Sequence, residues 1–153
     1  MSESDATGKA RLPESGVEAS RARREALHTA VEDLERGVAA LESEPDLGCF
    51  AATMRDVLRT VHQHVDEVEA PDGLLDEMMT VAPRVAYRVE KLRREHADLL
   101  ERTRSLLQRA EEHDTLELLA TDGRALAKDL SAHRHRGTDL MQDVFLTDIP
   151  AAD

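Results

Sequence analysis

The sequence has few aromatic residues. Its 153 residues include two phenylalanines, one tyrosine and no tryptophan. Aromatic and β-branched residues favour strands, whereas Ala, Leu, Glu and Arg, which are abundant here, favour helices. The composition therefore predicts an all-α fold whose core is built from Leu, Val and Ala, and a length of this kind fits one domain.

Cysteine is equally scarce. Cys49 is the single cysteine, so no disulfide can form within the chain and nothing points to an oxidising compartment. Without a second cysteine as a redox partner, a buried or inert thiol is expected. No apolar run approaches the roughly 18 residues of a transmembrane helix, and the polar start of the chain lacks a signal-peptide core. We expect a cytoplasmic protein without a membrane partner.

Positive charge is the third shortage, since 32 acidic residues outnumber 20 basic ones and the net charge is −12. Such a chain repels nucleic acid unless its basic residues are segregated, so no nucleic-acid partner is expected. The nearest basic cluster is formed by Arg21, Arg23 and Arg24. Acidic residues flank this cluster, which predicts a solvated helix face.

Four segments carry apolar residues at helical spacing. They run from about residue 17 to 42, 50 to 70, 82 to 110 and 116 to 147, with a short helical turn at 74–79. Pro71 and Gly73 end the second segment, and Pro83 suits the first turn of the third. Gly123 is a candidate break near the start of the fourth.

Short polar links between these segments predict an antiparallel up-down four-helix bundle. The bundle is expected to span residues 16–148, between a disordered N-terminal tail at 1–15 and a C-terminal tail at 149–153.

Two histidines lie at the centre of predicted buried helix faces. At about 100° per residue, His96 continues the apolar series of Leu92, and His133 continues that of Leu130. A neutral imidazole in an apolar interior needs a hydrogen-bonding partner or a metal ion. Imidazoles that converge inside a bundle are a common way to build a transition-metal site. Hydrogen bonds to neighbouring groups are the alternative.

Three other histidines lie on the flanks of their apolar stripes: His28, His62 and His64. His62 and Asp66 are four residues apart and could share one ion, with Glu67 next in the chain. A solvated acidic helix end is the alternative, because the helical wheel brings neither carboxylate inside.

In their order along the chain, these residues resemble the hemerythrin-like HHE cation-binding domains. The matching strings are LHTAV, HQHVDEVEAP, RREHADLL and SAHRHRGTDL, one in each long segment, within roughly residues 20–146. The family is a four-helix bundle with a non-haem di-iron centre in its full form. Its members bind or sense dioxygen or iron, or handle iron and nitric oxide.

The resemblance implies two groups of metal ligands: His28, His62 and Asp66 for one iron, and His96 and His133 for the other. A second alignment uses His64 with Glu67 or Glu69. Gly137 stands four residues after His133, where the family has a carboxylate, and an aspartate replaces the usual glutamate at position 66. The set is therefore consistent with a di-iron centre, with a single metal ion, or with none.

The expected function is a hemerythrin-like module that binds or senses a metal, with the metal ion and dioxygen as partners. A metal-free bundle that acts as a structural or interaction scaffold is the alternative, in which His96 and His133 are buried polar residues that fix the helix register. No nucleophile with its base, phosphate loop or matched acid–base pair stands out, so no enzyme activity is expected.

Overall fold

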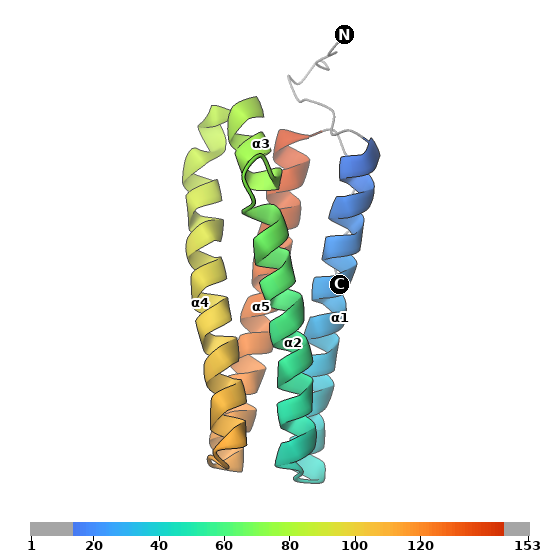
Figure 1. Ribbon diagram of the computed structural model, residues 1–153, viewed down its shortest axis with the longest axis vertical. Helices are drawn as coiled ribbons and strands as arrows, with labels where there is room; N and C mark the ends of the chain where they lie inside the picture. The colour runs from blue at the N-terminus through green and yellow to red at the C-terminus, as the bar shows by residue number, and fades with distance from the viewer. Residues whose placement is uncertain (1–13, 146–153) are drawn as a thin grey trace.

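The computed structural model describes residues 14–145 as a bundle of long helices (Figure 1). The helices are α1 (Glu14–Ser43), α2 (Leu47–Val68), α3 (Leu74–Val81), the 3-10 turn η1 (Pro83–Val85), α4 (Ala86–Glu111) and α5 (Leu116–Val144). Helix α1 packs against α2 and α5, and α4 packs against the same two helices. The predicted all-α, antiparallel up-down bundle is confirmed.

The short turn expected at residues 74–79 is the helix α3. It lies across one end of the bundle, where it contacts α2, α4 and α5 (Figure 1). Pro83 then opens η1, which leads directly into α4. Helix α3 thus closes the end of the bundle at which α2 finishes and α4 begins.

Gly123 does not interrupt the last helix, contrary to the sequence-based expectation. Helix α5 continues through this buried residue. A Cβ atom added at Gly123 would lie 2.8 Å from Cγ2 of Val38 and 3.6 Å from Cζ of Phe50. The missing side chain therefore lets α5 approach α1 and α2 closely, which outweighs the low helix propensity of glycine.

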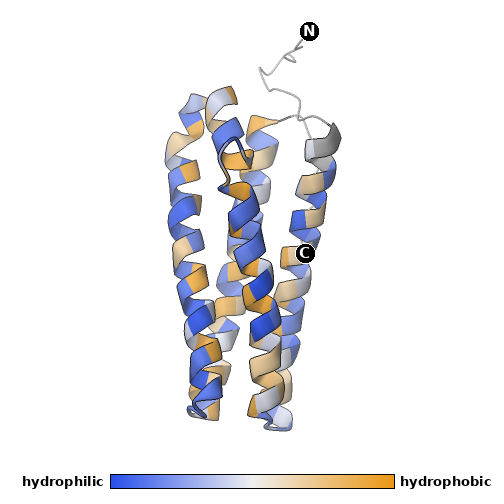
Figure 2. Ribbon diagram, in the orientation of Figure 1, coloured by the Kyte–Doolittle hydropathy of each residue, from blue (hydrophilic) through white to orange (hydrophobic). Residues whose placement is uncertain are grey.

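The core consists of two apolar clusters stacked along the bundle axis. The larger one is built from residues between Val31 and Val61 and between Leu99 and Leu130. The smaller one surrounds α3 and includes Val68, Leu92 and Leu140. Hydrophilic and hydrophobic residues alternate along the long helices (Figure 2). The helical segments between the two clusters carry the histidines described below.

Two further expectations concern exposed features. Cys49 is exposed rather than buried, and a hydrogen bond from its thiol to the Asp46 carboxylate raises the pKa of the thiol, so it is poorly reactive. Between residues 14 and 145, no helix has the length and apolar content required to cross a bilayer. The predicted tails lie outside the described residues, except that Glu14 and Ser15 belong to α1.

Candidate metal centre

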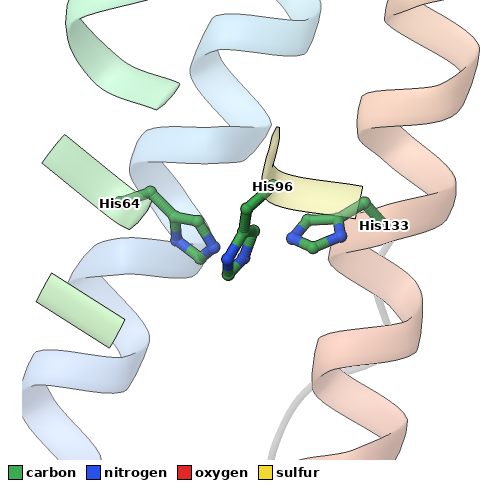
Figure 3. Close-up of side chains that lie close together, drawn as sticks. All are labelled: His64, His96 and His133. Atoms are coloured by element: carbon green, nitrogen blue, oxygen red, sulfur yellow. The ribbon is translucent and has the colours of Figure 1, made fainter. Parts of the chain in front are cut away.

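Three histidines from three helices meet between the two halves of the core (Figure 3). His64 comes from α2, His96 from α4 and His133 from α5. The ring centroids of His96 and His133 are 4.7 Å apart, and those of His64 lie 5.2 Å from His96 and 5.7 Å from His133. One nitrogen from each ring lies within 4.8 Å of the other two, so the three can reach a common ion.

Helical spacing explains why these side chains share one layer. Each histidine follows a buried residue of its own helix by three or four positions: Val61, Leu92 and Leu130, respectively. Residues this far apart lie on the same helix face. The histidines therefore occupy core positions, and the layer they form separates the two apolar clusters.

Two of the imidazoles are held by glutamates. Nδ1 of His96 is 2.7 Å from Oε2 of Glu69, and Nδ1 of His133 is 2.7 Å from Oε1 of Glu95. An ionised carboxylate can only accept a hydrogen bond, so Nδ1 of each ring carries the proton and donates it. The other carboxylate oxygen of Glu95 is 2.8 Å from Nε of Arg136. Both rings consequently keep the Nε2 lone pair for another partner.

His64 differs because its Nδ1 atom is buried and has no hydrogen-bond partner among the described residues. An unsatisfied buried nitrogen costs free energy unless a metal ion or a hydrogen-bonding group completes it. This orphaned atom, next to two rings with free Nε2 lone pairs, is what a site for a transition metal requires.

All three imidazoles are neutral at physiological pH. Burial lowers the pKa of His64 to about 2. The positive charge of Arg23, and those of His96 and His133 in their protonated forms, lower it further. Burial also lowers the pKa of His133 to about 4, against the opposing hydrogen bond to Glu95. Burial lowers the pKa of His96 as well, opposed by Glu69. Neutral rings can donate lone pairs to a metal without first losing a proton.

Glu95 remains ionised beside His133. Burial tends to raise its pKa, but hydrogen bonds from His133 and Arg136 outweigh that tendency and hold the pKa below its usual value. A carboxylate bound to the Nδ1–H of a metal-binding histidine fixes the ring orientation and makes the other nitrogen more basic. Glu95 is therefore suited to position His133, as Glu69 is to position His96.

These pKa values predict that the metal-free protein loses stability in mild acid. A histidine in the unfolded chain titrates near about 6.5, above the folded values, so the unfolded state takes up more protons as the pH falls below about 6.5. The free energy of unfolding in urea, with a chelator present, should be constant above this pH and fall between about pH 6.5 and 5. Carboxylates are still ionised in this range. Unchanged stability across it would contradict the burial of neutral imidazoles.

The donor set suits a divalent transition metal. Imidazole nitrogens bind Zn²⁺, Fe²⁺, Co²⁺ and Cu²⁺, and three histidines leave a fourth position open in a tetrahedral site. Nitrogens on one Zn²⁺ lie about 3.4 Å apart, given zinc–nitrogen bonds of about 2.0–2.1 Å. The nitrogens of the three rings lie within 4.8 Å of one another, so the rings must move closer together to bind one ion.

The structure places His62 and Asp66 away from this cluster. Both are exposed, and Nδ1 of His62 is 2.9 Å from Oδ2 of Asp66. Two residues along a helix turn it by about 200°, so when His64 faces inward His62 must face outward. The sequence allowed either His62 or His64 as the ligand from this helix, and in the structure His64 is the one that faces the interior.

His28 is also outside the cluster. Its Nε2 atom is 3.3 Å from Oε1 of Glu32, on a partly exposed face of α1. Leu27 takes the inward position at this level and is only 3% exposed. The described residues therefore bring together His64, His96 and His133 rather than the ligands implied for two separate irons.

A small cavity opens beside the imidazole rings. It has a volume of about 50 Å³ and is lined by all three histidines and by other residues of α1, α2, α3, α4 and α5. A volume of about 10–15 Å³ admits one water molecule, so a small ligand fits. Gly137 lies on its wall, and a Cβ atom there would meet nothing within 4 Å. The carboxylate missing at this position thus leaves open space next to His133.

Comparisons with known proteins add no relative. The chain matches no family model, no curated protein and no solved structure.

Proposed function

We propose that this chain is a metal-binding module that holds one divalent transition-metal ion between α2, α4 and α5. His64, His96 and His133 are the ligands. The observation that supports this proposal best is the convergence of three neutral imidazoles, two of which are oriented by partly buried glutamates. The order of the histidines along the chain resembles that of hemerythrin-like domains. Non-haem iron is therefore the first metal to test.

A single ion suits the donor set better than a bridged pair of irons. The carboxylates nearest the rings, Glu69 and Glu95, already accept hydrogen bonds from His96 and His133. Asp66, which the resemblance implies as a ligand, lies on the outer face beside His62. Three imidazoles leave a coordination position open, at which Fe²⁺ could take a small molecule such as dioxygen and Zn²⁺ could take water.

Metal titration tests the proposal. The full chain is stripped with a chelator and titrated with Fe(II) without oxygen, and separately with Zn(II) and Co(II). We expect one ion per chain and a higher melting temperature, since an ion at about 100 times its dissociation constant adds about 2.7 kcal/mol of stability. Visible bands of bound Co(II) report the coordination geometry.

His62→Ala provides the matched control for this titration. It removes an exposed histidine two residues from His64 and should leave the stoichiometry unchanged. A wild-type chain that retains none of the three metals, and whose melting temperature ignores them, would sink the proposal in favour of the metal-free scaffold.

A further inference from the structure

The walls of the cavity beside the histidines carry more positive charge than the acidic composition suggests. Arg23 and Arg24 of α1 and the buried Arg134 of α5 all line it. The sequence predicted a solvated helix face for Arg23 and Arg24, and this prediction is wrong for both, because each is partly buried against the cavity. No aspartate or glutamate of the described residues lines this cavity.

Arg23 and Arg24 contrast with the other arginines. Ten arginines of the described chain form ion pairs with carboxylates. Neither Arg23 nor Arg24 forms an ion pair within residues 14–145, and Nε of Arg24 is buried without a hydrogen-bond partner. The charge of Glu67 raises the pKa of Arg23, but Oε1 of Glu67 already accepts a hydrogen bond from Nε2 of Gln63 at 3.0 Å.

Like charges also meet at this wall. Burial lowers the pKa of Arg24, and the neighbouring charges of Arg21 and Arg134 lower it further while Glu25 opposes them. Arg23 is close enough to His64 for its charge to lower the pKa of that imidazole. Partly buried cations that repel one another are stabilised by an anion placed between them.

A hydroxyl completes the polar part of the cavity. Thr138 is 6% exposed, and its Oγ1 atom is buried without a hydrogen-bond partner in the described part of the chain. A buried hydroxyl normally has a partner. Nε of Arg24, Oγ1 of Thr138 and Nδ1 of His64 are thus three unsatisfied polar atoms, each on a residue that lines the same cavity.

The remaining wall is apolar. Leu74 and Met78 of α3, Leu92 of α4 and Met141 of α5 line the same space. A guanidinium group recognises a planar carboxylate through two parallel hydrogen bonds. An apolar wall opposite accommodates a short hydrocarbon tail.

We propose that this cavity binds a small monocarboxylate. Arg23 and Arg24 hold the carboxylate group, Thr138 donates its hydroxyl hydrogen to it, and the leucine and methionine side chains surround a short alkyl tail. Binding does not require the metal, so this proposal goes beyond the metal site. A metal on His64 would nevertheless increase the affinity, because its charge lies at the same cavity and linkage makes the effect mutual.

Calorimetric titration with formate, acetate and butyrate tests the proposal on the full chain. Metal-free protein should bind acetate and butyrate. Chloride at equal ionic strength is titrated in parallel as the inorganic anion for comparison. Arg24→Gln should weaken acetate binding about ten- to hundredfold, which is the loss of one charged hydrogen bond. Thr138→Val should weaken it by a smaller factor.

Arg55→Gln is the matched control, because it removes the same charge from an exposed ion pair on α2. It should leave acetate binding unchanged. An affinity for acetate that Arg24→Gln leaves unaltered, or no saturable binding of any of the three carboxylates with or without Zn(II), would overturn the proposal. Carboxylate binding by a protein that takes up no metal would retain this proposal and remove the metal site alone.

Discussion

His64→Leu should abolish high-affinity metal binding. Removal of a ligand that supplies one of three nitrogens should raise the dissociation constant for Zn²⁺ more than about a hundredfold, beyond the 10- to 100-fold typical of a lost supporting hydrogen bond. The same change should leave the stability of the metal-free protein equal or higher. Leucine has a similar size, and the substitution removes a buried nitrogen that lacks a partner.

Two measurements on each protein distinguish these effects. A competition titration with a chromogenic chelator gives the Zn²⁺ affinity, and urea unfolding with a chelator gives the stability of the metal-free chain. His62→Leu serves as the control, because this exposed residue pairs with Asp66 on the outer face. Equal losses of Zn²⁺ affinity for the two variants would mean that the interior cluster is not the site.

Glu95→Gln should produce the second largest effect. The amide oxygen can still accept the Nδ1–H of His133, but the negative charge that makes the ring more basic is lost, and Arg136 loses its ionic partner. Zn²⁺ affinity should fall about 10- to 100-fold with one ion still bound per chain. The Co(II) spectrum should keep its general form, since the three ligands are unchanged.

Glu101→Gln is the control for this variant. It removes the same charge from an exposed position on the same helix. If it weakens Zn²⁺ binding as much as Glu95→Gln does, the effect comes from net charge and not from the position of the carboxylate beside His133.

Much of the fold could be predicted because each long helix has one apolar stripe. The spacing of buried residues along α4, from Val89 and Leu92 to Leu99, identifies its inward face regardless of what packs against it. His96 and His133 lie at the centre of such faces, so their burial was predicted and is confirmed at 2% and 3% exposure.

The third histidine of the cluster could not be identified from the apolar stripe of its helix alone. His62 and His64 border it on opposite sides, and which border faces the interior depends on where α4 and α5 lie relative to α2. Packing of three helices sets this rotation, and the sequence of one helix does not contain it. The available signal for His64 was that His96 and His133, on two other helices, are both predicted to face the interior.

The positions of the charged side chains around the site were also hidden. Arg23 and Arg24 are flanked by acidic residues in the chain, which is typical of a solvated face. Only the packing of α1 against α5 places them on the wall of a cavity that residues of α3 also line. Glu69 is 27 residues from His96, so their hydrogen bond depends on how α2 and α4 pack.

The depth of the three-histidine layer has a consequence for the speed of metal exchange. Two of the rings are almost inaccessible to solvent, and α3 covers the adjoining end of the core. Because His96 and His133 are nearly inaccessible to solvent, an ion bound to all three rings should depart when the helices that carry them separate locally. Release to an excess of chelator should then proceed at the rate of that opening, independent of chelator concentration, and the protein would retain its metal long after the free ion has gone.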